Sequence, residues 1–324
     1  MLARRDMMLG LAGAAAASLH ARAAIAGYRV IPQRPSARVI VDNDFAGDPD
    51  GLIALAHQLL TPKTRTVLVT SSALDRAMLG SAPADGSAAL GRDIAIELIS
   101  RAGIANAPPV LAGAEALGAA GMGPSAAARA IVAEAMRDDP MPLYFTCGGP
   151  LTNLAAALEL EPAIAQRMTV IWIGGGAYPQ GGREYNMSAD IPAARHVIER
   201  SSVPLWQVPQ PAYRQMQSSV AELRDQLRPI SPFTAWLYDK FTTPPAFVDL
   251  GGAWPLGDSP TVLLSAISAE SSHYVERPAQ RILPDGRYGR AVPGRTLRVF
   301  ETLDVRLAFA DFFALMRLHA RGEL

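Results

Sequence analysis

The chain has little that would crosslink it or bind it to a polyanion. Its 324 residues include one cysteine, Cys147, so an intrachain disulfide is excluded. Lysine occurs only at Lys63 and Lys240, the formal net charge is zero and no run of basic residues appears, so no nucleic-acid partner is expected. Aromatic residues make up 6% of the chain, but hydrophobic residues make up 49%. This composition and length predict a sizeable core that needs no crosslinks.

Long apolar runs are also scarce, and no segment beyond the N-terminus is long enough to span a membrane. At the N-terminus, Arg4-Arg5 precede an apolar stretch from Met7 to Leu19, and Ala21-Arg22-Ala23 offers a small-residue cleavage site. This pattern is typical of a twin-arginine (Tat) signal peptide. We therefore expect residues 1–23 to direct export to the periplasm or the medium, without a stable membrane anchor. The alternative is an uncleaved leader in a cytosolic protein.

Apolar runs typical of buried strands alternate with segments of helical spacing. Strands are expected at residues 38–41, 66–70, 109–112, 142–146, 168–173 and 203–208. Helices are expected at residues 52–60, 88–102, 125–136, 191–200 and from the turn after residue 150 to residue 160. This alternation predicts an α/β fold, with a mostly parallel central sheet and helices on both faces. Ligands of such sheets bind beyond the carboxyl ends of the strands.

Four aspartates follow the first expected strand within nine residues: Asp42, Asp44, Asp48 and Asp50. Carboxylates this close repel one another and are tolerated where a cation neutralises them. Carboxylate and carbonyl oxygens favour a hard cation such as Ca²⁺ or Mg²⁺. The acidic turn therefore predicts a metal site at the carboxyl edge of the sheet, although a solvated acidic loop would show the same residues.

Three further classes of protein can carry clustered acids of this kind. An EF-hand loop requires glutamate at its twelfth position, which here is Ile53 or Leu55, so it is excluded. A phosphatase of the haloacid-dehalogenase type also begins with a strand and D-x-D, with Asp42 as nucleophile and Asp44 as general acid. It requires a downstream lysine, and neither lysine of this chain has a convincing context. A non-catalytic sugar-binding protein is the third possibility.

Four stretches, in order, resemble the inosine–uridine-preferring nucleoside hydrolases. They are the acidic turn, Gly148-Gly-Pro-Leu-Thr-Asn-Leu-Ala155 with Leu158-Glu-Leu-Glu-Pro162, Trp172-Ile-Gly-Gly-Gly176 with Glu184-Tyr-Asn186 and Pro192-Ala-Ala194, and Gly257-Asp-Ser-Pro260. Each stretch alone is a weak signal, but four in order are specific. The resemblance spans roughly residues 36–320 and implies one domain of nucleoside-hydrolase type, with a Rossmann-like fold.

The resemblance implies hydrolysis of the N-glycosidic bond of a ribonucleoside to ribose and free base, with one bound Ca²⁺. The N-terminal aspartates, the backbone carbonyl of Gly148 and the late Asp258 would bind the ion. Asp44 would also act as general base towards the attacking water. Asp48 and Asp50 would divide metal ligation and sugar contact between them.

The same resemblance places Glu184 and Asn186 on the ribose hydroxyls and Tyr185 on the nucleobase. Trp254 is a further candidate for the base pocket. The expected partner is therefore a small nucleoside or riboside, and because the family commonly forms dimers or tetramers, a homo-oligomer is possible.

Two departures from the family pattern bear on the chemistry. The family's adjacent aspartates correspond here to Asp48-Pro49-Asp50-Gly51, so either Pro49 or Gly51 stands where the second aspartate belongs. The histidine before the late aspartate, a leaving-group acid in purine-cleaving members, is Gly257. The alternatives therefore remain a hydrolase of another ribosyl glycoside, a non-catalytic ribose- or nucleoside-binding protein, and the phosphatase.

Overall fold

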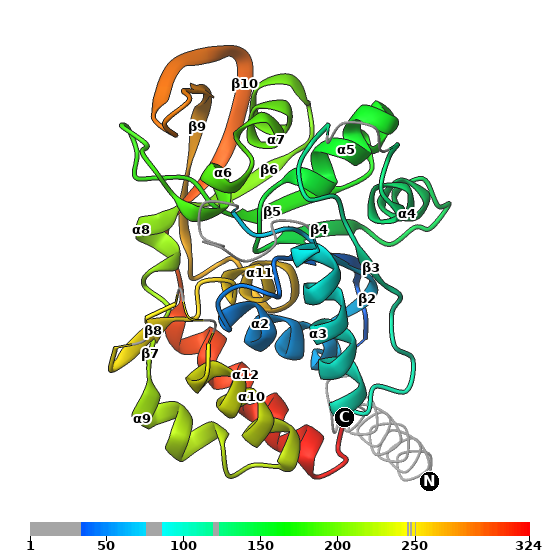
Figure 1. The fold of residues 1–324 in the computed structure, drawn as a ribbon, viewed down its shortest axis with the longest axis vertical. Coiled ribbons are helices and arrows are strands. Elements are labelled where there is room, and N and C mark those ends of the chain that lie inside the picture. The colour runs from blue at the N-terminus through cyan, green and yellow to red at the C-terminus, as the bar shows by residue number, and fades with distance from the viewer. Residues whose placement is uncertain (1–33, 76–85, 119–122, 245, 247, 250) are drawn as a thin grey trace, which may run out of the picture. The chain divides into compact units, whose positions relative to one another are not determined.

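The central sheet contains eight strands of the part of the chain that the structure describes (Figure 1). The strands are β1 (Ala37–Asn43), β2 (Thr64–Ser71), β3 (Val110–Ala112), β4 (Leu143–Cys147), β5 (Thr169–Ile173), β6 (Leu205–Val208), β9 (His273–Ile282) and β10 (Tyr288–Thr302). Their order is β3-β2-β1-β4-β5-β6-β10-β9, and only the β9–β10 pair is antiparallel. The first six agree with the expected strands to within two residues, which confirms the mostly parallel α/β fold. The β9–β10 pair was not predicted.

This computed structural model describes residues 34–75, 86–118, 123–244, 246, 248–249 and 251–324. The expected signal peptide at residues 1–23 lies outside these ranges. Pro35–Leu324 forms one compact unit. A search of the described helices finds none that is both long and apolar enough to cross a membrane.

The longer helices are α2 (Asp50–Leu60), α3 (Ser87–Arg101), α4 (Ala126–Ala135), α5 (Thr152–Leu160), α10 (Pro232–Thr242) and α12 (Val305–Ala320). Shorter helical segments are η1 (Pro162–Gln166), α6 (Tyr185–Ala189), α7 (Ile191–Arg195), η2 (His196–Arg200), α8 (Gln210–Tyr213), α9 (Val220–Glu222), η3 (Leu223–Leu227), α11 (Pro260–Val262) and η4 (Leu263–Ile267). The strands β7 (Gln217–Ser219) and β8 (Ala253–Pro255) form a separate antiparallel pair. The expected helix at residues 191–200 is thus divided, because its second half is the π-helical η2.

Helices cover both faces of the sheet. Val39 and Val41 of β1 pack in a buried cluster with side chains of α2, α3, α10 and α12, whereas Ile40 packs in a second cluster with side chains of α4, α5 and α7. Since successive side chains of a strand point to opposite faces, the two clusters lie on opposite sides of the sheet, as Figure 1 shows for their helices. This arrangement confirms the expectation of a doubly covered sheet.

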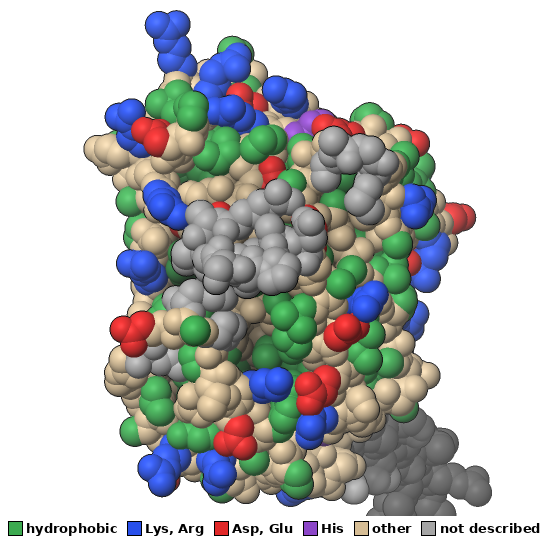
Figure 2. All heavy atoms as spheres, viewed as in Figure 1, with side chains coloured by type: hydrophobic (Ala, Val, Ile, Leu, Met, Phe, Trp, Pro, Cys, Tyr) green, Lys and Arg blue, Asp and Glu red, His purple; other side chains and the backbone are tan. Residues whose placement is uncertain are grey.

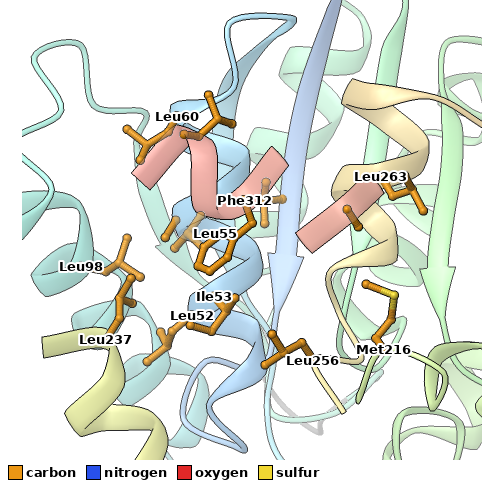
Figure 3. Close-up of a cluster of buried hydrophobic side chains, with 14 of the residues drawn as sticks. Leu52, Ile53, Leu55, Leu60, Leu98, Met216, Leu237, Leu256, Leu263 and Phe312 are labelled. Carbon is orange, nitrogen blue, oxygen red and sulfur yellow. The ribbon is translucent and has the colours of Figure 1, made fainter. Parts of the chain in front are cut away.

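The larger of these clusters joins helices that are far apart in the sequence. Figure 3 shows Leu55 of α2 beside Phe312 of α12, with Leu98 of α3 and Leu237 of α10 in the same cluster. Burying one such side chain stabilises the fold by about 1.5–3 kcal/mol. Because the lone Cys147 is a buried free thiol, burial of this kind takes the place that disulfides have in crosslinked proteins.

The surface contrasts with this apolar interior. On the face shown in Figure 2, basic and acidic side chains lie interspersed among hydrophobic and uncharged polar ones. This mixture agrees with the zero net charge of the chain.

Candidate functional site

A cavity of about 440 Å³ gathers residues that follow β1, β4 and β5. Its walls come from the acidic turn, the strand ends, α6, α8, the β7–β8 pair and the turn before α11. The lining residues are Asp48, Asp50, Gly148, Ile173, Glu184, Tyr185, Asn186, Gln210, Tyr213, Arg214, Gln217, Val248, Ala253, Trp254, Pro255, Gly257 and Asp258. All predicted site residues except Asp44 are among them, so the strand ends converge as expected.

Asp44 is buried at 3% exposure and does not line the cavity. Its Oδ2 atom is buried without a hydrogen-bond partner among the described residues. Burial raises the pKa of this carboxyl well above its usual value, and the negative charges of Asp48 and Asp258 raise it further. Asp44 is therefore a buried acid whose charged form lacks a compensating group.

The remaining acids of the site also repel one another. Asp50 begins α2, and its Oδ2 accepts the backbone N–H of Asp258 at 3.2 Å. Burial raises the pKa of both Asp50 and Asp258, and the negative charges of neighbouring acids raise both values further. Burial likewise raises the pKa of Asp48, and hydrogen bonds with the side chains of Asp50 and Trp254 oppose that rise. Within the described ranges, no ion pair involves any of these acids.

The fold brings the carboxylate oxygens of these acids together, but the side chains are not arranged as a formed metal site. Among the residues the structure describes, no group of three or more His, Cys, Asp or Glu side chains is arranged to hold a metal ion. The donors present are oxygens, and the basic side chain among the described lining residues is the exposed Arg214. This chemistry fits a hard cation better than a soft metal.

Gly148 follows β4, and close contacts explain the absence of a side chain there. A Cβ atom at this position would lie 2.3 Å from Nδ2 of Asn43 and 2.5 Å from Cγ of Asp258. Its backbone carbonyl accepts from Nδ2 of Asn186 at 2.9 Å, and the same Nδ2 donates to the carbonyl of Ile173. The Oδ1 atom of Asn186 is buried and unpartnered among the described residues. Gly148 and Asn186 thus form a fixed polar wall with one free acceptor.

Glu184 is held by four donors. Its Oε2 accepts the backbone N–H groups of Gly175 at 2.8 Å and Met187 at 3.0 Å, and the contact with Met187, together with one from Asn186, makes Glu184 the N-cap of α6. Its Oε1 accepts from the backbone N–H of Asn186 and from the hydroxyl of Tyr213 at 3.1 Å. Burial raises its pKa, and these donors oppose that rise. Glu184 therefore lines the cavity in a fixed orientation, and its contact with ribose stays a prediction.

Asp42, the first acid of the turn, lies beneath the site. Its Oδ2 accepts from the Thr70 hydroxyl at 2.5 Å and from Nδ2 of Asn153 at 2.7 Å. Burial raises the pKa of Asp42 to about 6, although these donors lower it. A phosphatase nucleophile needs a free carboxylate oxygen, whereas Oδ2 of Asp42 accepts two hydrogen bonds and Oδ1 accepts one from the Cys147 thiol. This placement weighs against the phosphatase alternative.

The tertiary structure adds site residues that were not predicted from the sequence. Tyr213 of α8 lines the cavity with Gln210, Arg214 and Gln217 from the segment that links β6 to β7. A Cβ atom at Gly257 would lie 3.1 Å from Cδ2 of Tyr213, so the tyrosine ring stands beside the glycine that the resemblance aligns with the family histidine. The sequence of the segment between β6 and β7 has no motif that would have identified it as part of the site. Asn43 could have been noticed, because it lies between two aspartates at the end of β1.

Comparisons with known proteins agree with this fold. The family model described as inosine-uridine preferring nucleoside hydrolase matches residues 39–279, which is most of the chain. A segment of 61 residues is 44% identical to the pyrimidine-specific ribonucleoside hydrolase RihB of Escherichia coli O1:K1 / APEC. That segment covers 18% of this chain and 19% of the relative; a putative RihB of Shigella boydii serotype 4 matches over the same length, 25% of that relative. The chain thus covers a quarter or less of these relatives' length.

Solved structures share the fold over nearly the whole chain. The purine-preferring ribonucleoside hydrolase from Gardnerella vaginalis is 19% identical, with a TM-score of 0.67 over 88% of this chain and 99% of that one. The inosine-uridine preferring nucleoside hydrolase from Bacillus anthracis is 18% identical, with a TM-score of 0.62 over 87% and 99%. At this identity the likeness establishes the fold, and the family model establishes the kinship. The chain belongs to the inosine-uridine preferring nucleoside hydrolase family, whose members are hydrolases that act on N-glycosyl compounds.

Proposed function

We propose that this chain hydrolyses the N-glycosidic bond of ribonucleosides, releasing ribose and a free base, with Ca²⁺ bound at the acidic end of the cavity. The observation that supports it most is the gathering of buried and half-buried acids that form no ion pair with the residues the structure describes. Asp48, Asp50 and Asp258 line one cavity, and Asp44 lies next to them with an unpartnered oxygen. Such a set is costly to bury unless a cation is bound.

The oxygens around the cavity fit a hard cation. Carboxylates of Asp48, Asp50 and Asp258, with the carbonyl of Gly148, would supply the ligands, and Oδ1 of Asn186 is free to meet a sugar hydroxyl. When bound, the cation would supply Lewis-acid chemistry that makes water more acidic and orients a diol. Calcium is preferred to magnesium here because several carboxylates and a backbone carbonyl can supply the roughly six to eight oxygen ligands that calcium takes.

The residues of the chain would perform the remaining steps. Asp44 would accept a proton from the attacking water on its free Oδ2 atom. Cleavage of an N-ribosidic bond builds positive charge on the sugar ring, and the surrounding carboxylates would stabilise that charge. Glu184 and Asn186, held on α6, would fix the ribose so that water and the anomeric carbon stay in line.

A substrate screen tests this proposal. Purified protein is incubated with inosine, uridine and p-nitrophenyl riboside, with and without a chelator, and released reducing sugar is measured. Chelator-sensitive release supports the proposal. A riboside that raises the melting temperature and is never cleaved indicates a binding protein. Phosphate released from a phosphoester, and lost in Asp42→Asn, indicates the phosphatase.

We also propose that the chain is exported by the twin-arginine route and acts in the periplasm or outside the cell. The support is the order of Arg4-Arg5, the short apolar stretch and Ala21-Arg22-Ala23, within residues that the structure does not describe. N-terminal sequencing of the protein recovered from a periplasmic fraction tests it. An Arg4→Lys/Arg5→Lys variant is expected to remain in the cytoplasm, and cytoplasmic full-length wild-type protein would contradict the proposal.

A further inference from the structure

Asn43 contacts Asp258 beside the cavity and has no role assigned so far. It is the last residue of β1, lies between Asp42 and Asp44, and is 3% exposed. Its Nδ2 donates to Oδ2 of Asp258 at 2.9 Å, a contact that joins residues 215 positions apart. The side chain thus connects the acidic turn to the late aspartate.

Two glycines leave the space that the Asn43 side chain fills. A Cβ atom at Gly51 would lie 2.8 Å from Oδ1 of Asn43, and one at Gly148 would lie 2.3 Å from its Nδ2. Neither glycine has a positive φ, so backbone conformation does not require glycine at either position. The packing of the Asn43 side chain against both positions requires glycine there.

We propose that Asn43 is a positioning residue of the acidic site: its carboxamide fills the space that a side chain at Gly51 would need and holds Asp258 towards the acidic turn. This inference rests on the proposed cation site. A carboxylate at residue 51 would add a negative charge to an already acidic cavity. The Asn43 amide instead donates a hydrogen bond to a carboxylate there, which orients that oxygen.

The same geometry favours the alignment in which Gly51 stands where the second aspartate belongs, although Asp48 lines the cavity as well. Asp50 and Gly51 open α2, Asp50 lines the cavity, and the space beside Gly51 holds the amide of Asn43. We therefore place Asp50 and Gly51 where the family has its two adjacent aspartates. In this chain the second carboxylate is absent, and Asn43 occupies the space that its side chain would need.

Melting of the cation-free protein tests the packing. The variants are Asn43→Ala, Gly51→Asp and Asn43→Ala/Gly51→Asp, with Gly123→Asp as the control because a Cβ atom at exposed Gly123 meets nothing within 4 Å. Gly51→Asp is expected to lower the melting temperature, Gly123→Asp to leave it unchanged, and Asn43→Ala to relieve most of the effect of Gly51→Asp. If the two substitutions change the melting temperature additively, the claim that Asn43 and a side chain at residue 51 would occupy the same space is wrong.

Calorimetric titration with Ca²⁺ tests the positioning role, with exposed Asn106→Ala as the control. Asn43→Ala is expected to weaken calcium binding by about 10- to 100-fold, as removal of a ligand's orienting partner does. The double variant, which regains a carboxylate at residue 51, is expected to bind more tightly than Asn43→Ala. Unchanged affinity in Asn43→Ala would overturn the role.

The two measurements separate this inference from the proposed function. A wild-type protein that binds no calcium would overturn the calcium part of the proposed function and the role of Asn43 in it, while the melting data still decide whether Asn43 and Gly51 share one space. Calcium binding in the wild type with unchanged affinity in Asn43→Ala would overturn the inference alone.

Discussion

The two ends of β1 bury charge in opposite ways. Near its start, Arg38 is 3% exposed and forms ion pairs with Glu134 and, at 3.6 Å, with Asp139. Its guanidinium also donates to the backbone carbonyl of Glu134 at 3.0 Å. Just beyond the other end, Asp44 is equally buried, but its Oδ2 has no partner among the described residues. One strand therefore carries a neutralised charge at one end and a group of unneutralised charges at the other.

This difference separates a structural site from a functional one. A buried charge with a full set of partners holds its surroundings together, and removing a partner is costly. Buried acids that lack such partners raise the free energy of the ligand-free protein. Their presence indicates that a bound ligand neutralises them. The comparison thus assigns the Arg38 cluster to stability and the acids around Asp44 to binding and catalysis.

The largest expected effect is on catalysis at the acidic end. Asp44→Ala should lower the rate of riboside hydrolysis by about 10²- to 10⁴-fold, the usual contribution of a general base. The cation-free protein should keep or gain stability, because a buried acid with a raised pKa is removed. Reducing-sugar release and thermal melting measure the two quantities, with exposed Asp225→Ala as the control. Retained activity would refute the role of Asp44.

The opposite result is expected at the other end. Arg38→Ala should destabilise the fold by about 3 kcal/mol, because Glu134 and Asp139 lose their buried cation and keep the exposed Arg137 as their partner. Hydrolysis measured well below the melting temperature should change little, since Arg38 does not line the cavity. Urea unfolding gives the free energy, and exposed Arg167→Ala is the control. A loss of activity without a loss of stability would break the comparison.

The two ends should also respond to pH with opposite signs. The pKa of Asp42 is raised from 3.8 to about 6, so its contribution to stability is complete below pH 3.8 and is lost as pH rises from about 4 to 6. A shift of this size is worth about 3 kcal/mol. The backbone N–H of Met141, and then Arg38, lower the pKa of Asp139, whose contribution is lost as pH falls.

Melting in the presence of a chelator measures the balance of these contributions. The pKa values of Asp44 and the acids around it are raised, as that of Asp42 is. The cation-free protein should therefore melt at a higher temperature at pH 5 than at pH 8. Saturating calcium should reduce or reverse that difference, since the bound cation favours the ionised carboxylates. Cation-free stability that rises with pH over this range would contradict the assignment.

The smallest expected effect concerns the orientation of Glu184. Tyr213→Phe removes one of its four donors, a hydroxyl at 3.1 Å, and keeps the ring beside Gly257. The loss of about 1 kcal/mol corresponds to roughly a fivefold lower kcat/KM, with little change in stability. Steady-state kinetics measure it, and exposed Tyr274→Phe is the control. An effect as large as that of Asp44→Ala would indicate that Tyr213 takes part in proton transfer.

Much of the fold could be predicted because local patterns encode it. The first six strands are short apolar runs bounded by turn residues, as buried parallel strands are. The β9–β10 pair was missed because its side chains are largely exposed and its strands contain Pro278, Gly289, Pro293 and Gly294, which usually indicate turns. Its place beside β6 depends on pairing across almost a hundred residues.

For the site, the sequence by itself determined that the aspartates after β1, Gly148 after β4 and the glycines after β5 lie together, because the strand ends of a parallel sheet converge. The resemblance to the family added Glu184 and Asn186. Only the tertiary structure decided that Asn43 fills the space beside Gly51, that Tyr213 holds Glu184, and that Asp42 lies beneath the cavity. These contacts join segments without any shared spacing, and side-chain packing in three dimensions determines them.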